Sequence, residues 1–254
     1  MGEWNFDMTG KVVLVTGGSR GIGKDIALAM AELGAKVIIC SRKQEGLDEV
    51  TREFKNKGHE VIARATHIAK SEQVGALFQF LGEEYGRLDI LINNVGMNIM
   101  TPAVADVEEG LWDKIIETNL KGTFLVSSHA VKLMRKGNGG KIVNITTVAA
   151  RKAAMGMGVY GVAKAGVEML TRVLAVELAS DHINVNAVAP GMVKTRFSKP
   201  FWGDESTLKE LTGTIPMGRI AEKADVVGAV LYLSSDLADY ITGQVISVDG
   251  GALA

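Results

Sequence analysis

Short apolar runs rich in β-branched residues alternate with segments of helical periodicity along the chain, and this alternation restricts the fold more than any other feature. The apolar runs lie at 11–16 (KVVLVT), 36–41, 60–65, 88–93, 141–146, 183–188 and 244–248. They are nearly continuous rather than alternating, which is typical of parallel strands covered on both faces. The helical segments lie between them, at about 21–34, 44–57, 71–85, 109–136, 157–180 and 222–235. We therefore predict an α/β fold with a doubly wound, Rossmann-type parallel sheet.

The size and composition are those of one globular unit. The chain has 254 residues and a net charge of −1, so we expect a single domain over 1–254 and no nucleic-acid partner. It contains one cysteine and no apolar run of membrane-spanning length, and we expect an intracellular, cytoplasmic protein without membrane association. The main irregular stretch, about 190–216, is interpreted as a substrate lid with a short helix near 205–212.

A glycine-rich loop follows the first predicted strand and opens the first predicted helix. Its glycines are Gly17, Gly21 and Gly23, a G-x-x-x-G-x-G spacing. Glycines allow a tight turn and a close backbone approach, and unpaired N–H groups at a helix start attract a pyrophosphate. The alternative is an ordinary glycine-rich turn. The loop residues predicted to contact a dinucleotide are Gly17, Ser19, Arg20, Gly21, Ile22 and Gly23.

The end of the second predicted strand bears on the choice between NAD(H) and NADP(H). An NAD site usually has an acidic residue there, but this chain has Ser41 and Arg42. Arg42 is suited to a charge-assisted bond with a 2′-phosphate, and Arg20 is placed to approach from the opposite side. The alternative is that Arg42 and Lys43 begin a solvated helix. We favour NADP(H).

A tyrosine and a lysine lie four residues apart in the segment 160–164 (YGVAK). On a helix Tyr160 and Lys164 share one face. A nearby ammonium favours the phenolate and lowers the tyrosine pKa, so the pair is a candidate general acid/base. Alone the spacing is common, and the alternative is an exposed Tyr/Lys pair.

Several segments together resemble the short-chain dehydrogenase/reductase family, in particular its 3-oxoacyl reductase-like and NADP-dependent carbonyl reductase members. The resemblance covers nearly the whole chain. It rests on 16–23, 93–96 (NNVG), Asn119, 144–147 (NITT), 160–164, 190–191 (PG), and 242–251, which contains TG and VDGG. It implies a seven-stranded sheet in the order 3-2-1-4-5-6-7 and a homotetramer or homodimer.

The resemblance also implies roles for individual residues. Tyr160 would exchange a proton with the substrate oxygen, and Lys164 would hold the nicotinamide ribose and lower the Tyr160 pKa. Asn119 would anchor a water in a proton relay. Thr147 occupies the place of the hydroxyl that orients the carbonyl, where the family normally has serine. Threonine keeps the donor and adds a methyl group, so we expect activity to persist with a reshaped pocket.

Further cofactor contacts are implied along the same edge of the sheet. His67 stands where the family often has an aspartate that binds the adenine amino group, and a solvated histidine is the alternative. Ile68 is expected to pack on the adenine ring, and Thr195 to bond the carboxamide. The other implied contacts are Asn94, Gly96, Pro190, Gly191 and Val193. Apolar side chains interpreted as a substrate pocket or as plain core are Met97, Met100, Met155, Met157, Phe197, Phe201 and Trp202.

The expected function is the interconversion of a ketone and a secondary alcohol by hydride transfer. One substrate hypothesis is a small free ketone, cyclic or aromatic ones included, and the other is a 3-oxoacyl thioester on a carrier protein or coenzyme A. Val176 stands where carrier-protein reductases of the family tend to have arginine, which favours a free substrate. A non-catalytic nucleotide-binding regulator is the alternative of another class. His59, His129 and His182 lack metal-ligand spacing, and no metal is expected.

Overall fold

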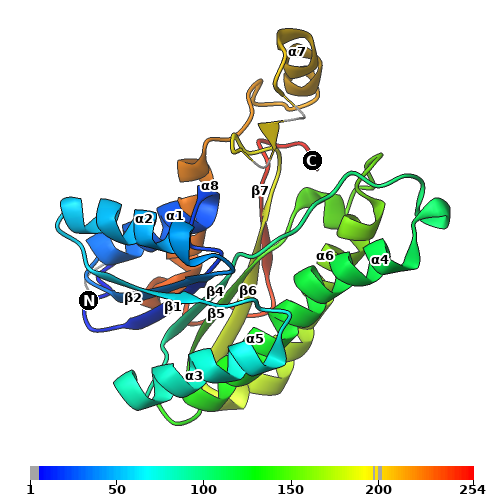
Figure 1. The fold of residues 1–254 in the computed structure, drawn as a ribbon. Helices are drawn as coiled ribbons and strands as arrows, with labels where there is room; N and C mark the ends of the chain where they lie inside the picture. The colour runs from blue at the N-terminus through cyan, green and yellow to red at the C-terminus, as the bar shows by residue number, and fades with distance from the viewer. Residues whose placement is uncertain (1–5, 197, 200–201) are drawn as a thin grey trace.

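A computed structural model of the chain describes residues 6–196, 198–199 and 202–254. Its centre is a parallel sheet in the order β3-β2-β1-β4-β5-β6-β7 (Figure 1), which confirms the predicted topology. The strands are β1 (Val12–Thr16), β2 (Lys36–Ser41), β3 (Val61–Ala65), β4 (Ile90–Asn93), β5 (Gly140–Ile145), β6 (Ile183–Pro190) and β7 (Val245–Val248).

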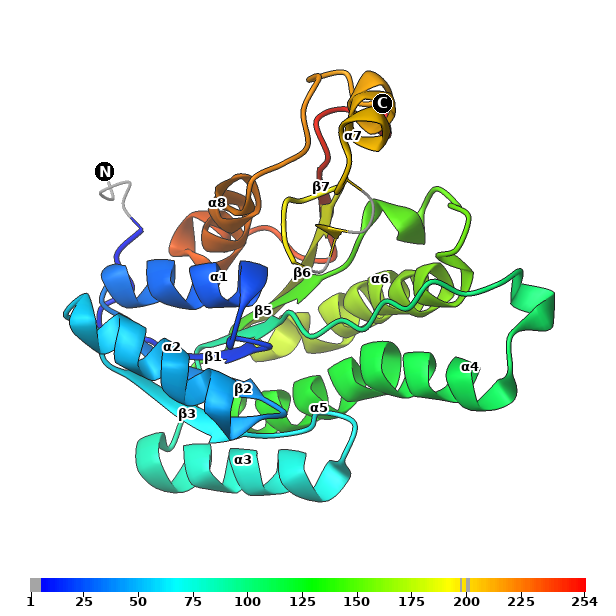
Figure 2. The same cartoon turned by 45° about the horizontal axis from the view of Figure 1, so that its top comes forward.

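Helices cover both faces of the sheet (Figures 1 and 2). Alternate residues of β1 belong to two separate cores: Val13 and Val15 pack on one side, and Val12 and Leu14 pack on the other. The first core includes α1 (Gly21–Glu32), α2 (Gln44–Asn56) and α8 (Lys223–Ser234). The second includes α3 (Ser71–Tyr85), α5 (Gly122–Met134) and α6 (Gly158–Leu178). Burial on both sides explains why the strands are apolar throughout.

The long helix predicted over 109–136 is interrupted. It divides into α4 (Glu109–Ile116), a π-helical turn (Glu117–Lys121) and α5. Within the turn, the side-chain amide of Asn119 donates to the carbonyl oxygen of Ile115 at 2.9 Å. A side-chain N–H thus bonds a carbonyl oxygen of the preceding turn, which would otherwise accept a backbone hydrogen bond. A side chain inserted in this way interrupts the regular backbone hydrogen bonds of a helix. The π-helical turn brings the Asn119 side chain against the segment that follows β4.

The segment between β6 and α8 carries α7 (Glu205–Gly213), which Figures 1 and 2 show standing apart from the sheet. The predicted helix at 205–212 is thereby confirmed. Asp204 begins the helix, because its carboxylate accepts a hydrogen bond from the Thr207 N–H at 2.9 Å. The helix buries none of its residues. No helix in the described part of the chain has the length and hydropathy needed to span a membrane.

Candidate active site

The glycine loop after β1 is tightly packed against Asn94, which follows β4. Gly17 has a φ of 70°, a backbone conformation that favours glycine. The Asn94 side-chain amide donates to the carbonyl oxygens of Thr16 at 3.1 Å and Gly17 at 3.3 Å. A Cβ atom on Gly23 would lie 2.6 Å from the Gly17 carbonyl oxygen and closer still to the Asn94 amide. Only glycine fits at 23 without a shift of backbone.

The start of α1 has the features of an anion site. Arg20 is its N-cap, with no side-chain hydrogen bond to the helix, and the first turn holds no acidic residue. The early N–H groups of a helix lack partners inside the helix and carry partial positive charge. The loop and helix start therefore have the shape and charge that suit a dinucleotide pyrophosphate.

Positive charge gathers at the ends of β2 and β3. Burial of the imidazole lowers the pKa of His67, and the positive charges of Arg42 and Lys70 lower it further. The His67 ring accepts a hydrogen bond from the Ala69 N–H through Nδ1 at 3.3 Å, which leaves Nε2 for another contact. Ile68 is 3% exposed and lies against Gly122 of α5. Its side chain is part of the core.

Tyr160 and Lys164 are both buried on one face of α6, so the predicted pair is brought together and is not an exposed one. The Lys164 ammonium lies 6.0 Å from the centre of the Tyr160 ring. It donates to the carbonyl oxygens of Ile145 at 2.8 Å and Val95 at 3.5 Å. Gly96 lies beside it, since a Cβ there would be 3.7 Å from Nζ.

Burial determines the protonation of this pair. It lowers the pKa of Lys164 to about 8 and raises the pKa of Tyr160. The direction for Tyr160 is opposite to the lowering by Lys164 expected from the sequence, because desolvation of the phenolate raises its pKa. At neutral pH the structure therefore holds a protonated phenol.

Asn119 connects the helix bulge to the segment after β4. Its Oδ1 accepts from the Met97 N–H at 3.0 Å, and its Nδ2 donates to the Met97 carbonyl oxygen at 2.9 Å. With the bond to Ile115, these contacts use both amide protons and one of the two lone pairs of Oδ1. The side chain thus fixes the loop that carries Gly96.

The two threonines after β5 point to different surroundings. Thr147 is the N-cap of a 3-10 turn, η3 (Val148–Ala150), and its hydroxyl accepts from the Ala149 N–H at 3.3 Å. Its own proton is left for a further acceptor. The single proton of the Thr146 hydroxyl is instead shared between the Val188 carbonyl oxygen at 3.2 Å and Glu168 Oε1 at 3.4 Å. Thr147 is therefore the hydroxyl suited to meet a substrate oxygen.

The stretch after β6 brings together the remaining predicted contacts. Gly191 packs against Asp249, where a Cβ would lie 3.0 Å from the aspartate backbone. Val193 is 5% exposed. The Thr195 hydroxyl lies 3.1 Å from that of Ser198, which also bonds the Val193 carbonyl oxygen. Sequence reasoning missed Ser198, although a hydroxyl three residues after a threonine is a known signal for such a turn.

The side chains expected to line an apolar pocket are only partly gathered. Met155 and Met100 are 95% and 63% exposed, whereas Met157 lies against Asn98. The Trp202 indole donates to Ser198 at 2.9 Å. Phe197 and Phe201 lie outside the described residues.

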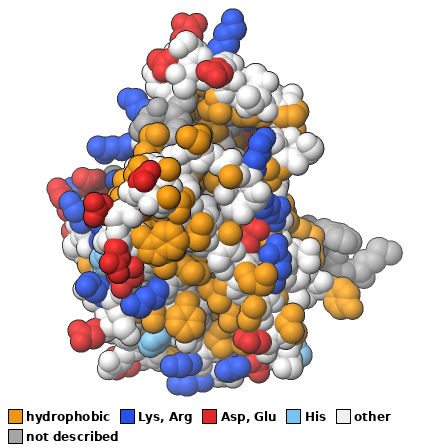
Figure 3. Space-filling model, turned by 90° about the vertical axis from the view of Figure 1, so that its right-hand side faces the viewer, with side chains coloured by type: hydrophobic (Ala, Val, Ile, Leu, Met, Phe, Trp, Pro, Cys, Tyr) orange, Lys and Arg blue, Asp and Glu red, His pale blue; other side chains and the backbone are white. Residues whose placement is uncertain are grey.

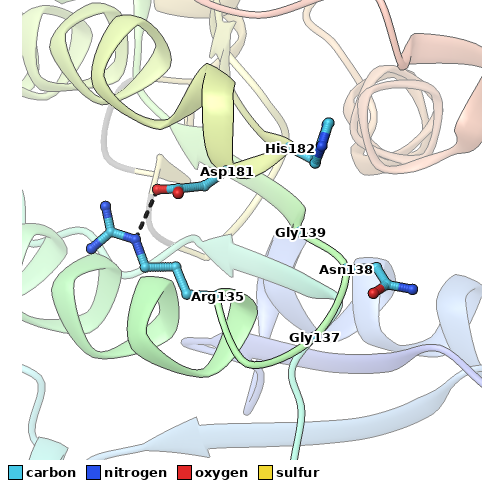
Figure 4. Close-up of a pocket in the computed structure, with 6 residues that line it drawn as sticks. All are labelled: Arg135, Gly137, Asn138, Gly139, Asp181 and His182. Atoms are coloured by element: carbon cyan, nitrogen blue, oxygen red, sulfur yellow. Dashed lines mark hydrogen bonds and ion pairs between the residues drawn. The ribbon is translucent and has the colours of Figure 1, made fainter.

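A surface hollow of about 690 Å³ lies far from these residues, at the amino ends of β5 and β6 (Figure 4). It is lined by Arg135, Gly137, Asn138, Gly139, Asp181 and His182. Arg135 and Asp181 form an ion pair, with 2.8 Å between Nε and Oδ2, so the hollow has little net charge from them. In open parallel sheets ligands bind at the carboxyl ends of the strands, so this hollow is at the wrong edge. Residues 6–196, 198–199 and 202–254 contain no cluster of three or more side chains that could hold a metal ion.

Comparison with known proteins identifies the family to which this arrangement belongs. A family model described as enoyl-(acyl carrier protein) reductase matches residues 17–252. Dehydrogenase/reductase SDR family member 4 of Caenorhabditis elegans is 39% identical over 249 residues, which cover 96% of each chain. The chain belongs to the short-chain dehydrogenase/reductase family. The predicted resemblance is confirmed, and as a family member the chain is an oxidoreductase that acts on alcohol or carbonyl groups.

Other short-chain dehydrogenases/reductases match this chain over nearly its whole length. The 3-oxoacyl-(acyl-carrier-protein) reductase of Thermotoga maritima is 36% identical over 244 residues, covering 96% of this chain and 98% of that relative. The crystal structure of a gluconate 5-dehydrogenase from Burkholderia cenocepacia in complex with NADP and tartrate matches with a TM-score of 0.93 at 31% identity. That match covers 98% of this chain and 97% of the other.

Proposed function

We propose that the chain interconverts a ketone and a secondary alcohol with NADP(H), using Tyr160 as the acid/base. The observation that carries the proposal is the burial of Tyr160 and Lys164 on one face of α6, beside the loop that holds Gly96. When bound, NADPH supplies the hydride that is transferred to the carbonyl carbon. The fit of the nucleotide is supported by the uncapped start of α1 and by the lack of a Cβ at Gly17 and Gly23, which lets the loop pack closely against Asn94.

The residues of the chain would handle the proton and the orientation of the substrate. Thr147 would donate its hydroxyl proton to the carbonyl oxygen and hold the carbonyl in place. Tyr160, protonated at neutral pH because its pKa is raised, would give its proton to the same oxygen as negative charge develops there. The Lys164 ammonium, which already binds the Val95 carbonyl oxygen, would stabilise the phenolate that remains. In alcohol oxidation each proton step runs in reverse.

The preference for NADP(H) is proposed on the charges at the ends of β2 and β3. Besides burial, the positive charges of Arg42 and Lys70 lower the pKa of His67, so both side chains lie within electrostatic range of that imidazole. Arg20 is exposed at the N-cap of α1. A 2′-phosphate would be attracted to this group of cations. The NADP held by the gluconate 5-dehydrogenase is consistent with this choice.

A small free ketone is proposed as the substrate, with a 3-oxoacyl thioester as the second candidate because a carrier-protein reductase is among the relatives. Val176 is 82% exposed on α6 and offers no charge to an acidic carrier protein. Rates with cyclic ketones and with acetoacetyl-coenzyme A would separate the two. Higher kcat/KM for the thioester would reverse the order of these candidates.

The acid/base role is tested with Tyr160→Phe in a broad carbonyl screen with NADPH and NADH. We expect wild-type turnover to be faster with NADPH and to fall by at least about a thousandfold in the variant, a loss in the range of acid/base contributions. Equal rates in wild type and variant would identify a nucleotide-binding protein without this catalysis. A higher kcat/KM with NADH would contradict the cofactor proposal alone.

We also propose that the chain assembles as a homotetramer or homodimer through α5 and α6. Apolar side chains gather on the face that carries these helices (Figure 3). The exposed ones include Phe124, Met169, Val173 and Val176. Apolar patches of this kind mark interfaces. The mass in solution tests the proposal, and a monomer at micromolar concentration would overturn it.

A further inference from the structure

A buried carboxylate lies one turn beyond Lys164 on α6, and nothing in the proposed chemistry uses it. The Glu168 side chain is only 5% exposed. Its Oε2 accepts from Arg151 Nε at 3.0 Å, and its Oε1 accepts from the same Nε at 3.2 Å. Oε1 also accepts from the Thr146 hydroxyl at 3.4 Å, and Arg172 approaches Oε2 at 3.5 Å. Two cations and a hydroxyl thus converge on one buried acid.

Arg151 extends the network to the edge of the sheet. Its Nη1 donates to the Ser247 hydroxyl at 3.1 Å, and its Nη2 donates to the Val245 carbonyl oxygen at 3.3 Å. Both partners belong to β7. The guanidinium therefore joins α6 to β7 through a fixed, planar fork of donors, a geometry that lysine lacks.

The network holds the segment that carries the Thr147 hydroxyl at both ends. Before Thr147, the Thr146 side chain is fixed by Glu168 and by the Val188 carbonyl oxygen. After η3, Arg151 is fixed by Glu168 and β7. The same segment also touches α6 directly, since a Cβ on Gly161 would lie 2.7 Å from the Ala149 carbonyl oxygen. A displacement of η3 would change the position of Thr147 relative to Tyr160.

We propose that Glu168, through Arg151 and Thr146, is a positioning residue that holds the Thr147 hydroxyl at the distance from Tyr160 that hydride transfer requires. This inference rests on the proposed function, because Thr147 and Tyr160 meet the substrate only in that mechanism. In this mechanism Glu168 acts only through its contacts with Thr146 and Arg151. Its contribution comes from a buried, fully engaged carboxylate, whose neutralisation leaves Arg151 without its counter-charge.

Glu168→Gln tests the inference, because glutamine keeps the size of the side chain and removes its charge. We expect kcat to fall by about tenfold or more, since small displacements of reacting groups have large effects on rate. We expect the Kd of NADPH, measured by fluorescence titration, to stay within about twofold, because α1 and its loop lie outside the network. Glu84→Gln, at an exposed position on α3 away from the proposed interface, is the control and should retain wild-type kcat.

A double-mutant cycle with Thr147→Ala separates positioning from general destabilisation. If Glu168 acts through Thr147, Glu168→Gln should change the single-turnover rate by less than about twofold in the Thr147→Ala background. Equal losses in both backgrounds, or an unchanged kcat in Glu168→Gln, would overturn the inference. If Glu168→Gln does not fold, Arg151→Lys replaces it in the same cycle with the same expectations.

Tyr160→Phe, measured in parallel, distinguishes this failure from that of the proposed function. An inactive Tyr160→Phe with a fully active Glu168→Gln would refute the positioning role alone. A fully active Tyr160→Phe would refute both.

Discussion

Replacing Lys164 by methionine is expected to stabilise the nucleotide-free protein near neutral pH while removing its turnover. The lysine is 2% exposed. Its ammonium has two backbone carbonyl oxygens as partners, and no ion pair reaches it in the part of the chain that the structure describes. A buried cation without a carboxylate favours unfolding, because the charge regains water in the unfolded chain. Methionine has a similar length and no charge.

The magnitude follows from the pKa of Lys164, which burial lowers from 10.5 to about 8. Between these values the unfolded chain binds a proton that the folded one does not, so the free energy of unfolding rises with pH over that interval. At about 1.36 kcal/mol per pKa unit, the burial costs about 3 kcal/mol below pH 8, and this cost disappears toward pH 10.5. Methionine leaves two carbonyl oxygens unpaired at about 1 kcal/mol each. The net gain expected at pH 7 is about 1 kcal/mol.

Urea unfolding of the nucleotide-free wild type and Lys164→Met, at one protein concentration, measures this difference. Between pH 7 and pH 9.5 the wild type should gain about 2 kcal/mol relative to the variant. Lys141→Met is the control: that lysine is also buried, but it pairs with Asp239 at 2.6 Å, so its loss should not stabilise. A Lys164→Met protein that is less stable than wild type by the same amount at both pH values would refute the reasoning.

Three further experiments, two on substituted proteins and one on the unaltered chain, have defined outcomes. Gly23→Ala should raise the Kd of NADPH by about tenfold or more, because its Cβ would meet the Gly17 carbonyl oxygen at 2.6 Å; unchanged binding in a fluorescence titration would contradict this. Asn119→Ala should lower the free energy of unfolding by about 3 kcal/mol, because three hydrogen bonds disappear. Urea unfolding measures this loss, and a value below about 1 kcal/mol would argue against a structural role for the Asn119 side chain. Cys40, whose pKa burial raises to about 12, should resist a thiol reagent in the folded protein and react fully in denaturant; rapid labelling of the native chain would show that the strand opens.

The sheet could be predicted from the sequence because its strands are buried on both faces. The run 36–41 corresponds to β2 residue for residue, and the other strands differ from their predicted ranges by a few residues at the ends. The interruption around Asn119 could not be predicted in the same way. Helical periodicity averages over several turns, so one bulged turn inside an apolar helix leaves the pattern almost unchanged.

The candidate site was predictable where one short segment carries the chemistry. The glycine loop and the Tyr160–Lys164 pair are local patterns, and the structure places both at the expected edge of the sheet. The contacts between Glu168, Arg151 and β7 join residues 17 and more than 90 positions apart, and no local spacing indicates them. The protonation of Tyr160 was also out of reach, because it depends on how deeply the helix is buried.

The helix α7 stands beyond the sheet and contributes no buried residue. Amino-acid changes there therefore meet few packing constraints from the two cores. The surface that this helix presents can therefore diverge between sequences while the folded body keeps its packing. A library of variants confined to 205–213 should accordingly retain folded protein in most of its members.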